Sequence, residues 1–397
     1  MTGWITSAFA LFLVAPLAAA QEAAQVPARV PIVVGAAISE TGAHAGAAAD
    51  YRKGLVLWHE EINAGGGLLG RKVELRLVDD GSEAARAGRA YAALLEGGAQ
   101  VLIGPYGSAA TLTATAEAER TRRVLLNAAG PSGQVHKRSP QYVFQTSPNY
   151  AAYVQGVLEL ARQAGVEAPI VLGRDDAASR EMTEAALAQA AKYGFRHVEL
   201  ALYAGTNNDF LPQLYEAMAV QADAWIAFGE ARDGADMVKT LKRHGFVPKI
   251  LYARASADPR FIALIGQDAE YVLGSEDYDA RFARPGNAQF VKAFRTRWSS
   301  PPGTMAAAAY NAGKVLAAAA ARAGSVEPAK LRAALAELEM DTIFGRYRVD
   351  KTGAQVGMEP AVVQIVKGRA QPVWPADLAG GRKPAPFLPW ADREVLR

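Results

Sequence analysis

Residues 101–108 read Val-Leu-Ile-Gly-Pro-Tyr-Gly-Ser, and this stretch shows how the chain is built. Its apolar start predicts a buried strand, and the glycines and proline that follow predict a loop. A helix is expected next, over 109–122, before another apolar run at 124–126. Strands that alternate with helices in this way are typical of a parallel sheet covered by helices.

The same alternation continues on both sides of this stretch. Further strands are predicted at 32–36, 73–78, 170–173, 197–202, 224–228 and 249–252. Helices are predicted between them at 48–64, 84–97, 150–165, 180–193, 209–220 and 231–244. The sequence Thr146-Ser147-Pro148-Asn149 interrupts the pattern and marks a crossover. We therefore predict an α/β protein with two doubly wound parallel-sheet units in series.

The pattern weakens after Ser275. Residues 275–302 are polar and aromatic, and helices are expected at 304–323 and 328–338, followed by a hairpin at 347–353. The helix at 304–323 is alanine-rich, so it is expected to serve packing more than function. The proline-rich stretch from Trp374 onward is expected to be irregular.

The composition is that of an ordinary globular protein of one or two domains. The 397 residues are 50% hydrophobic and 21% charged, with 43 basic and 40 acidic side chains and no cysteine. Disulfides, thiolate nucleophiles and cysteine-ligated metals are therefore excluded. A net charge of +3 gives little reason to expect nucleic acid as a partner.

The first 20 residues carry no charged side chain, and their apolar stretch ends in Ala18-Ala19-Ala20. This pattern predicts a signal peptide, residues 1–20, and hence export to the periplasm. The alternative is an uncleaved membrane anchor, but the apolar stretch is short for a span of about 20 residues.

The motifs that carry chemistry in other proteins point here to structure. The stretch 65–70 has the glycine spacing of a dinucleotide site, but it follows a helix instead of a strand, so it is expected to stop that helix. The pairs Asp79-Asp80 and Asp175-Asp176 each follow a strand, where loop and capping roles are expected. The five histidines never fall at metal-ligand spacing. We predict no cofactor, no metal and no catalytic residue.

The loop 104–108 is the best candidate for contact with a ligand. It ends where a helix begins, so its backbone N–H groups can face an anionic group. Ser108 is then the N-cap of the helix or a donor to the ligand, and the two roles are compatible.

An ordered series of motifs resembles the periplasmic branched-chain amino-acid (Leu/Ile/Val) binding proteins of ABC transporters. The resemblance covers residues 30–368, and its most specific element is 61–70, Glu-Ile-Asn-Ala-Gly-Gly-Gly-Leu-Leu-Gly. The other matching elements are Ser39-Glu40-Thr41-Gly42, Gly54, Val78-Asp79-Asp80, Ile103-Gly104-Pro105 with Ser108, Asp175-Asp176, Asn208-Asp209-Phe210, Gly229, Gly245 and 345–353.

The resemblance implies a type I periplasmic binding fold. In this fold two α/β lobes are joined by three hinge crossovers, and hinge closure traps a ligand between them. On this basis residues 28–147 with 277–355 form lobe 1, residues 148–276 with 356–375 form lobe 2, and 376–397 form an irregular tail.

The resemblance also implies a ligand site at the carboxyl ends of the strands. In the family, a serine and backbone groups hold the ligand's α-carboxylate, while a threonine and an acidic residue hold its α-ammonium. Ser108 matches the serine. The run 127–132 covers the family's Ala-Ala-Thr element and includes Ala129 and Gly130. A proline stands at the threonine position, with Ser132 one place later, so the ammonium contact is in doubt.

Two charged positions depart from the family pattern. Counted without a gap from Asp209-Phe210, Arg254 replaces the acidic ammonium ligand and Glu230 replaces a pocket aromatic. An arginine suits a carboxylate, so we expect a ligand with an acid group and without the usual amino group there. The alternatives are that Arg254 and Glu230 pair with each other, or that the alignment slips by one residue.

The remaining candidate contacts are mostly aromatic: His44, Tyr106, Tyr150 and Phe228. Together with small residues at neighbouring pocket positions, they favour an aromatic or medium-chain carboxylic acid.

These observations predict a periplasmic, non-enzymatic receptor that captures a small organic solute, an amino acid or a carboxylic acid, for an ABC permease in the inner membrane. The alternative is a ligand-sensing regulator of the same fold, against which the export segment argues. An enzyme on this fold is disfavoured because nucleophile, metal and phosphate loop are all missing.

Overall fold

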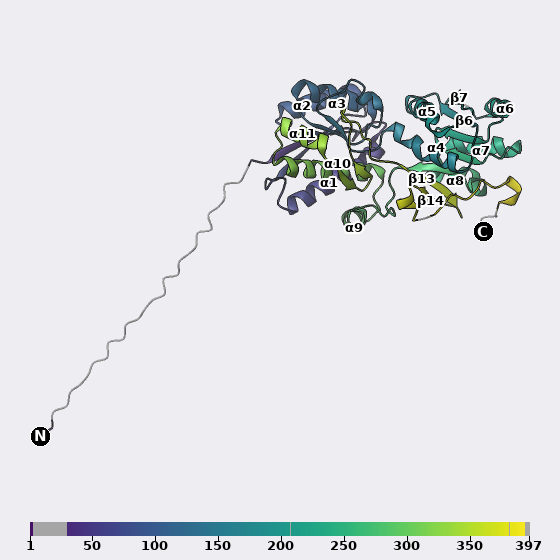
Figure 1. Cartoon of the computed structure of the whole chain (residues 1–397). Coiled ribbons are helices and arrows are strands. Elements are labelled where there is room, and N and C mark those ends of the chain that lie inside the picture. Colours follow the sequence, from purple (N-terminus) through teal and green to yellow (C-terminus); the bar gives the residue numbers. More distant parts are fainter. Residues whose placement is uncertain (3–29, 207, 381, 394–397) are drawn as a thin grey trace.

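The computed structural model describes residues 1–2, 30–206, 208–380 and 382–393. The predicted signal peptide therefore falls outside the described residues from residue 3 onward. The described chain forms two α/β lobes, each around its own sheet (Figure 1). None of the described helices is both long and apolar enough to cross a membrane.

The first lobe contains a five-stranded parallel sheet in the order β2-β1-β3-β4-β5. Alternate side chains enter opposite cores, because successive residues of a strand point to opposite faces. Val101 and Ile103 pack with α1 and α10, whereas Leu102 packs with α2 and α3. The strands are β1 (Ile32–Ile38), β2 (Val73–Asp79), β3 (Val101–Ile103), β4 (Leu125–Asn127) and β5 (Val143–Gln145). The helices are α1 (Ala45–Ala64), α2 (Ala84–Glu96), α3 (Ser108–Thr121), α9 (Asn287–Trp298), α10 (Thr304–Ala323) and α11 (Pro328–Glu337).

The second lobe contains a seven-stranded sheet in the order β14-β13-β10-β9-β8-β6-β7. It is parallel except for β13, which runs antiparallel to both β10 and β14. Helices α4 and α5 cover one face, and α6, α7 and α8 cover the other. The strands are β6 (Pro169–Arg174), β7 (Glu199–Tyr203), β8 (Ala224–Phe228), β9 (Ile250–Ala253), β10 (Leu273–Glu276), β13 (Ala361–Val366) and β14 (Arg369–Trp374). The helices are α4 (Tyr153–Gln163), α5 (Ala177–Ala190), α6 (Leu211–Ala219), α7 (Ala231–Arg243), α8 (Pro259–Ile265) and α12 (Ala376–Ala379).

The chain passes between the lobes three times: after β5, after β10 and before β13. The first and third passages lie side by side. The backbone N–H of Gln355 donates to the side chain of Gln145 (3.3 Å), and the Asn149 amide donates to the Gln355 carbonyl (2.8 Å). The predicted fold class, two doubly wound α/β lobes joined by three crossovers, is thus confirmed.

Several elements differ from the sequence prediction. Strands β5, β10, β13 and β14 and helices α8 and α9 were not predicted. A 3₁₀ turn at Tyr150–Ala152 precedes α4, because the side chain of Asn149 caps it. The hairpin expected at 347–353 is present as a short turn closed by an antiparallel bridge between Val349 and Gln355. A hairpin that was not predicted precedes it, made by β11 (Met340–Thr342) and β12 (Gly345–Tyr347). The tail is mostly irregular, as expected, apart from α12 and a 3₁₀ turn at Trp390–Asp392.

The glycine motif after α1 is a helix stop, as predicted. Helix α1 ends at Ala64 and Gly65 is its C-cap. Gly66 and Gly67 have φ angles of +97° and +84°, which favour glycine. A Cβ on Gly67 would lie 2.0 Å from the carbonyl oxygen of Arg71. The motif therefore turns the chain from α1 into β2.

Candidate functional site

A cavity of about 470 Å³ lies between the two lobes. Loops at the carboxyl ends of strands contribute much of its wall, which is where open α/β sheets bind ligands. Its lining residues are His44, Tyr106, Gly107, Ser108, Ala128, Ala129, Pro131, Ser147, Pro148, Tyr150, Tyr153, Asp176, Ala178, Ser179, Met182, Glu230, Arg254, Asp277, Thr304, Met305, Ala308 and Phe344. Seven of the ten predicted contacts are among them: His44, Tyr106, Ser108, Ala129, Tyr150, Glu230 and Arg254.

The start of α3 forms the wall on the first lobe. The N-cap is Gly107, with φ +89°, and Ser108 is the first helical residue, so the prediction of Ser108 as N-cap is wrong by one position. The backbone N–H of Gly107 donates to the Ala129 carbonyl at 3.0 Å, which ties the loop to the end of β4. The Oγ of Ser108 accepts a hydrogen bond from the Ser132 N–H at 3.2 Å. The Ser108 hydroxyl proton is left to be donated to an acceptor in the cavity.

Gly130 and Ser132, both predicted contacts, support the wall from behind and do not line the cavity. The side chain of Asn127 accepts from the Gly130 N–H (2.9 Å) and donates to its carbonyl (2.8 Å). The Ser132 hydroxyl donates to Glu181, on α5 of the second lobe, at 2.7 Å. Sequence reasoning missed Glu181, because only the approach of the two lobes brings it to this loop.

Arg254 is the cation of the second lobe's wall. It follows β9, is partly buried, and its Nε is buried without a hydrogen-bond partner. Among the described residues no ion pair or hydrogen bond holds its guanidinium, so the predicted alternative of a pair with Glu230 is not what the structure shows. Burial lowers the pKa of Arg254, but the neighbouring tyrosines and carboxylates outweigh this and raise it. The group stays charged and unpaired.

Asp277 and Tyr153 lie on the same side of the cavity. The Tyr153 hydroxyl donates to Asp277 Oδ2 at 2.5 Å, while Asp277 Oδ1 is buried without a partner. Burial raises the pKa of Asp277, against the opposing effects of the Tyr153 hydrogen bond and the charge of Arg254. Burial, followed by the charge of Asp277, also raises the pKa of Tyr153. Tyr153 therefore engages one oxygen of Asp277 and leaves the other, Oδ1, without a partner.

Aromatic side chains complete the lining. The rings of His44 and Tyr106 lie 5.2 Å apart, and those of Tyr150 and Tyr153 lie 6.3 Å apart. Burial is the main cause that raises the pKa of Tyr150 to about 12. Phe228, the tenth predicted contact, is fully buried in the second lobe and does not line the cavity.

Sequence reasoning also missed contributors from the first lobe's late segments. Thr304, Met305 and Ala308 line the cavity, so α10 serves the site at its start as well as the core along its length. Tyr278 is buried in the first lobe's core. Its neighbour Asp277 lines the cavity instead.

The paired aspartates serve loops and caps, as predicted. The Asp79 carboxylate accepts from Thr41, and Asp80 accepts from Ser39. Asp176 caps α5 by accepting from the Ser179 N–H at 2.8 Å. Within the described part of the chain, no three acidic or histidine side chains converge as metal ligands do.

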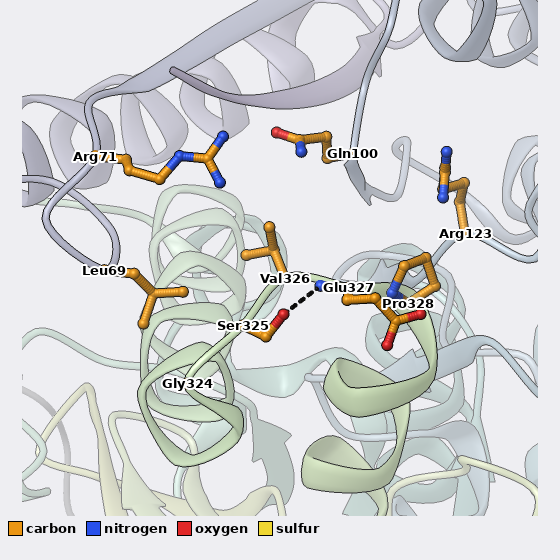
Figure 2. A pocket seen from close by; sticks show the side chains of 9 residues that line it. All are labelled: Leu69, Arg71, Gln100, Arg123, Gly324, Ser325, Val326, Glu327 and Pro328. Carbon is orange, nitrogen blue, oxygen red and sulfur yellow. Dashed lines mark hydrogen bonds between the residues drawn. The ribbon is translucent and has the colours of Figure 1, made fainter. Parts of the chain in front are cut away.

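A second cavity, of about 490 Å³, lies on the first lobe away from the cleft (Figure 2). Its polar groups are largely engaged with the protein itself. Arg71 donates to the Val30 carbonyl at 2.8 Å, and Gln100 accepts from the Val33 N–H at 3.3 Å. Glu327 accepts two N–H groups at the start of α11. The cavity between the lobes, with its unpaired cation, is the stronger candidate.

Comparisons with known proteins agree with this architecture. A family model described as "periplasmic binding protein" matches residues 31–370. The chain is similar to an "amino acid binding protein" of Pseudomonas aeruginosa, with 25% identity over 335 residues that cover 81% of this chain and 87% of the relative.

Two solved structures share the fold. A substrate-binding protein of an ABC transporter from Desulfitobacterium hafniense, in complex with Leu, has a TM-score of 0.72 at 24% identity and covers 86% of this chain and 100% of its own. A solute-binding protein of an ABC transporter from R. palustris, in complex with benzoate, has a TM-score of 0.66 at 20% identity and covers 87% of this chain and 96% of its own.

Proposed function

The chain belongs to the periplasmic binding protein family, and on that basis we propose that it is the solute receptor of an ABC importer. It captures a small organic ligand in the cavity between the lobes and presents the closed form to a permease in the inner membrane. A ligand that contacts both lobes binds the closed state more tightly and so shifts the hinge equilibrium. The predicted signal peptide would deliver the protein to the periplasm, and no chemical turnover is expected.

The ligand carries a carboxylate that Arg254 binds. The observation that supports this proposal is a partly buried guanidinium that lines the cavity with no ion pair or hydrogen bond among the described residues. Buried charges in proteins are normally paired. An unpaired one in a ligand cavity is best explained by an anionic ligand, and the planar fork of arginine matches a carboxylate.

The carboxyl groups of the wall are poor partners for an ammonium group. Asp176 is engaged by the Ser179 N–H and lies 3.4 Å from the Arg174 guanidinium. Asp277 accepts from Tyr153 with Oδ2, and burial raises the pKa of Asp277, which disfavours the charged form that would hold an ammonium with the unpartnered Oδ1. Glu230 is exposed to solvent. With the tyrosines of the lining, this arrangement favours an aromatic or aliphatic carboxylic acid over an α-amino acid. The benzoate complex of the R. palustris protein is a precedent on the same fold.

A thermal-shift screen of the chain from Gln21 onward tests the proposal. It compares benzoate, 3,4-dihydroxybenzoate and hexanoate with leucine, valine and phenylalanine. A ligand at about 100 times its Kd adds roughly 2.7 kcal/mol of stability. Stabilisation by acids that lack an α-amino group, lost in Arg254→Gln, is the expected result. Stabilisation by leucine or valine that persists in Arg254→Gln would overturn the proposed ligand class. If neither the carboxylic acids nor the amino acids stabilise the protein, this would count against a receptor function for such solutes.

A further inference from the structure

One carboxylate bridges the two lobes next to the cavity. Glu181, on α5 of the second lobe, accepts from the Ser132 hydroxyl at 2.7 Å and from the Gly133 N–H at 2.5 Å. Ser132 and Gly133 belong to the first lobe, in the loop that follows β4. Hydrogen bonds to a charged acceptor are the stronger class. Rotation of one lobe away from the other breaks both bonds.

The same loop sets the donor that faces the ligand. The Ser132 N–H donates to Ser108 Oγ at 3.2 Å. With one lone pair of Ser108 occupied in this way, its hydroxyl proton is directed elsewhere, and Ser108 lines the cavity. Glu181 fixes Ser132 through its hydroxyl and the next residue through its N–H. The carboxylate of one lobe therefore reaches the ligand-facing hydroxyl of the other through a single residue.

We propose that Glu181 is a positioning residue that couples closure of the lobes to the orientation of the Ser108 hydroxyl. When the lobes close, Glu181 holds the Ser132–Gly133 turn, and Ser108 presents its proton to the ligand. When they open, the turn is released and Ser108 loses its fixed orientation. The inference rests on the proposed function, because Ser108 meets a ligand only if the cavity binds one.

The distance between the lobes, measured without ligand, gives the first test. The chain has no cysteine, so spin labels on Leu112→Cys of α3 and Ala188→Cys of α5, both exposed, report this distance by pulsed electron resonance. Glu181→Ala is expected to move the distribution to longer distances. Glu181→Gln, which can still accept from the Gly133 N–H, is expected to restore part of the short-distance population.

Glu184→Ala is the matched control. Glu184 lies one turn further along α5, is exposed, and its loss removes the same charge. Its distance distribution is expected to match that of the parent. Distributions that are the same for Glu181→Ala and Glu184→Ala would overturn the closure part of the proposal, whatever ligand the protein binds.

The coupling to Ser108 is tested with benzoate as the probe, by calorimetry on the single variants Glu181→Ala and Ser108→Ala and on the double variant. Glu181→Ala is expected to weaken benzoate binding about tenfold in the parent and less than about twofold when Ser108 is already alanine. Additive effects would overturn the coupling. Absence of benzoate binding to the parent would contradict the proposed ligand, while the distance measurement would still decide on the closure.

Discussion

The backbone N–H of Ser132 donates a hydrogen bond to the side-chain oxygen of Ser108 at 3.2 Å. Both serines were predicted to contact the ligand, but only Ser108 lines the cavity. Ser132 holds Ser108 with its backbone and directs its own hydroxyl to Glu181. The two serines therefore have different parts in one arrangement, and substitutions distinguish them.

Ser108→Ala is expected to weaken carboxylate binding about tenfold, because a hydrogen bond to a charged group is lost. Ser132→Ala keeps the N–H that holds Ser108, so a smaller loss, of about threefold, is expected. Calorimetric titration with the carboxylate found in the screen measures both. A larger loss in Ser132→Ala than in Ser108→Ala would show that Ser108 is not the residue that meets the ligand.

Arg254→Gln is expected to weaken carboxylate binding on the order of 100-fold, because the ligand's charge loses its partner. Arg254→Lys keeps the charge but lacks the planar fork, so its carboxylate affinity should lie between those of the parent and Arg254→Gln. The matched pair benzoate and benzamide supplies the control, since the neutral amide should respond little to either change. Equal losses for the acid and the amide would indicate that Arg254 shapes the cavity and does not read the charge.

Arg254→Gln is also expected to destabilise the ligand-free protein slightly, because the surroundings of Arg254, including the charges of Asp277 and Glu230, favour its charged form by more than burial disfavours it. Urea unfolding without ligand measures this effect. A clear gain of stability would mean that the cost of burying the guanidinium outweighs its interactions with these neighbours.

Much of the fold could be predicted because the relevant signals are local. Strand β8 and helix α10 have the predicted boundaries, since each is a continuous apolar or alanine-rich run. Strand β14 was missed because Arg369-Ala370-Gln371-Pro372 lacks an apolar run and lies at the sheet edge. Helix α9 was missed because its few buried positions include the polar Asn287, and because Lys292, Arg295 and Arg297 make the segment read as polar.

The site could be predicted only in part. Ser108, Ala129 and Arg254 follow strands, so the rule that ligands bind at carboxyl ends of strands locates them. Asp277 and Glu181 carry no such signal. Asp277 meets the cavity because the chain crosses between the lobes there, and Glu181 meets Ser132 because the two lobes approach each other. These contacts depend on tertiary geometry that no local pattern encodes.

Gly130→Ala is expected to destabilise the protein by about 1–3 kcal/mol, because the added methyl group overpacks a filled site. A Cβ on Gly130 would lie 2.4 Å from the Oγ1 of Thr111, which is fully buried. Thr111→Ala removes that oxygen, so the double variant should lose less stability than the two single losses added together. Urea unfolding of the four proteins tests this. If the stability losses of the two single variants simply add in the double variant, the added methyl group does not clash with the Thr111 side chain.

Glu276, at the end of β10 beside the crossover, should make stability depend on pH. Burial, followed by the charges of Asp277 and Asp279, raises its pKa from 4.5 to about 8. Between these two values the folded protein holds a proton on Glu276 that the unfolded chain has released. The free energy of unfolding therefore falls as the pH rises through this window. The stability that protonated Glu276 contributes is fully present only below the pKa of the unfolded chain, about 4.5.

Glu276→Gln stays neutral at every pH, so it should remove this loss. We expect the variant to gain stability over the parent between about pH 5 and pH 8, by a few kcal/mol at most, since one pKa unit corresponds to about 1.4 kcal/mol and the side chain is partly exposed. Urea unfolding across this range measures the difference in unfolding free energy between the variant and the parent. Burial lowers the pKa of His136, which has the opposite effect on stability, but this effect is present in both proteins and cancels in the difference. The exposed Glu184→Gln serves as the control and should run parallel to the parent. A Glu276→Gln curve that also runs parallel would mean that Glu276 is ionised in the folded protein at neutral pH, with the charge of Arg281 outweighing burial.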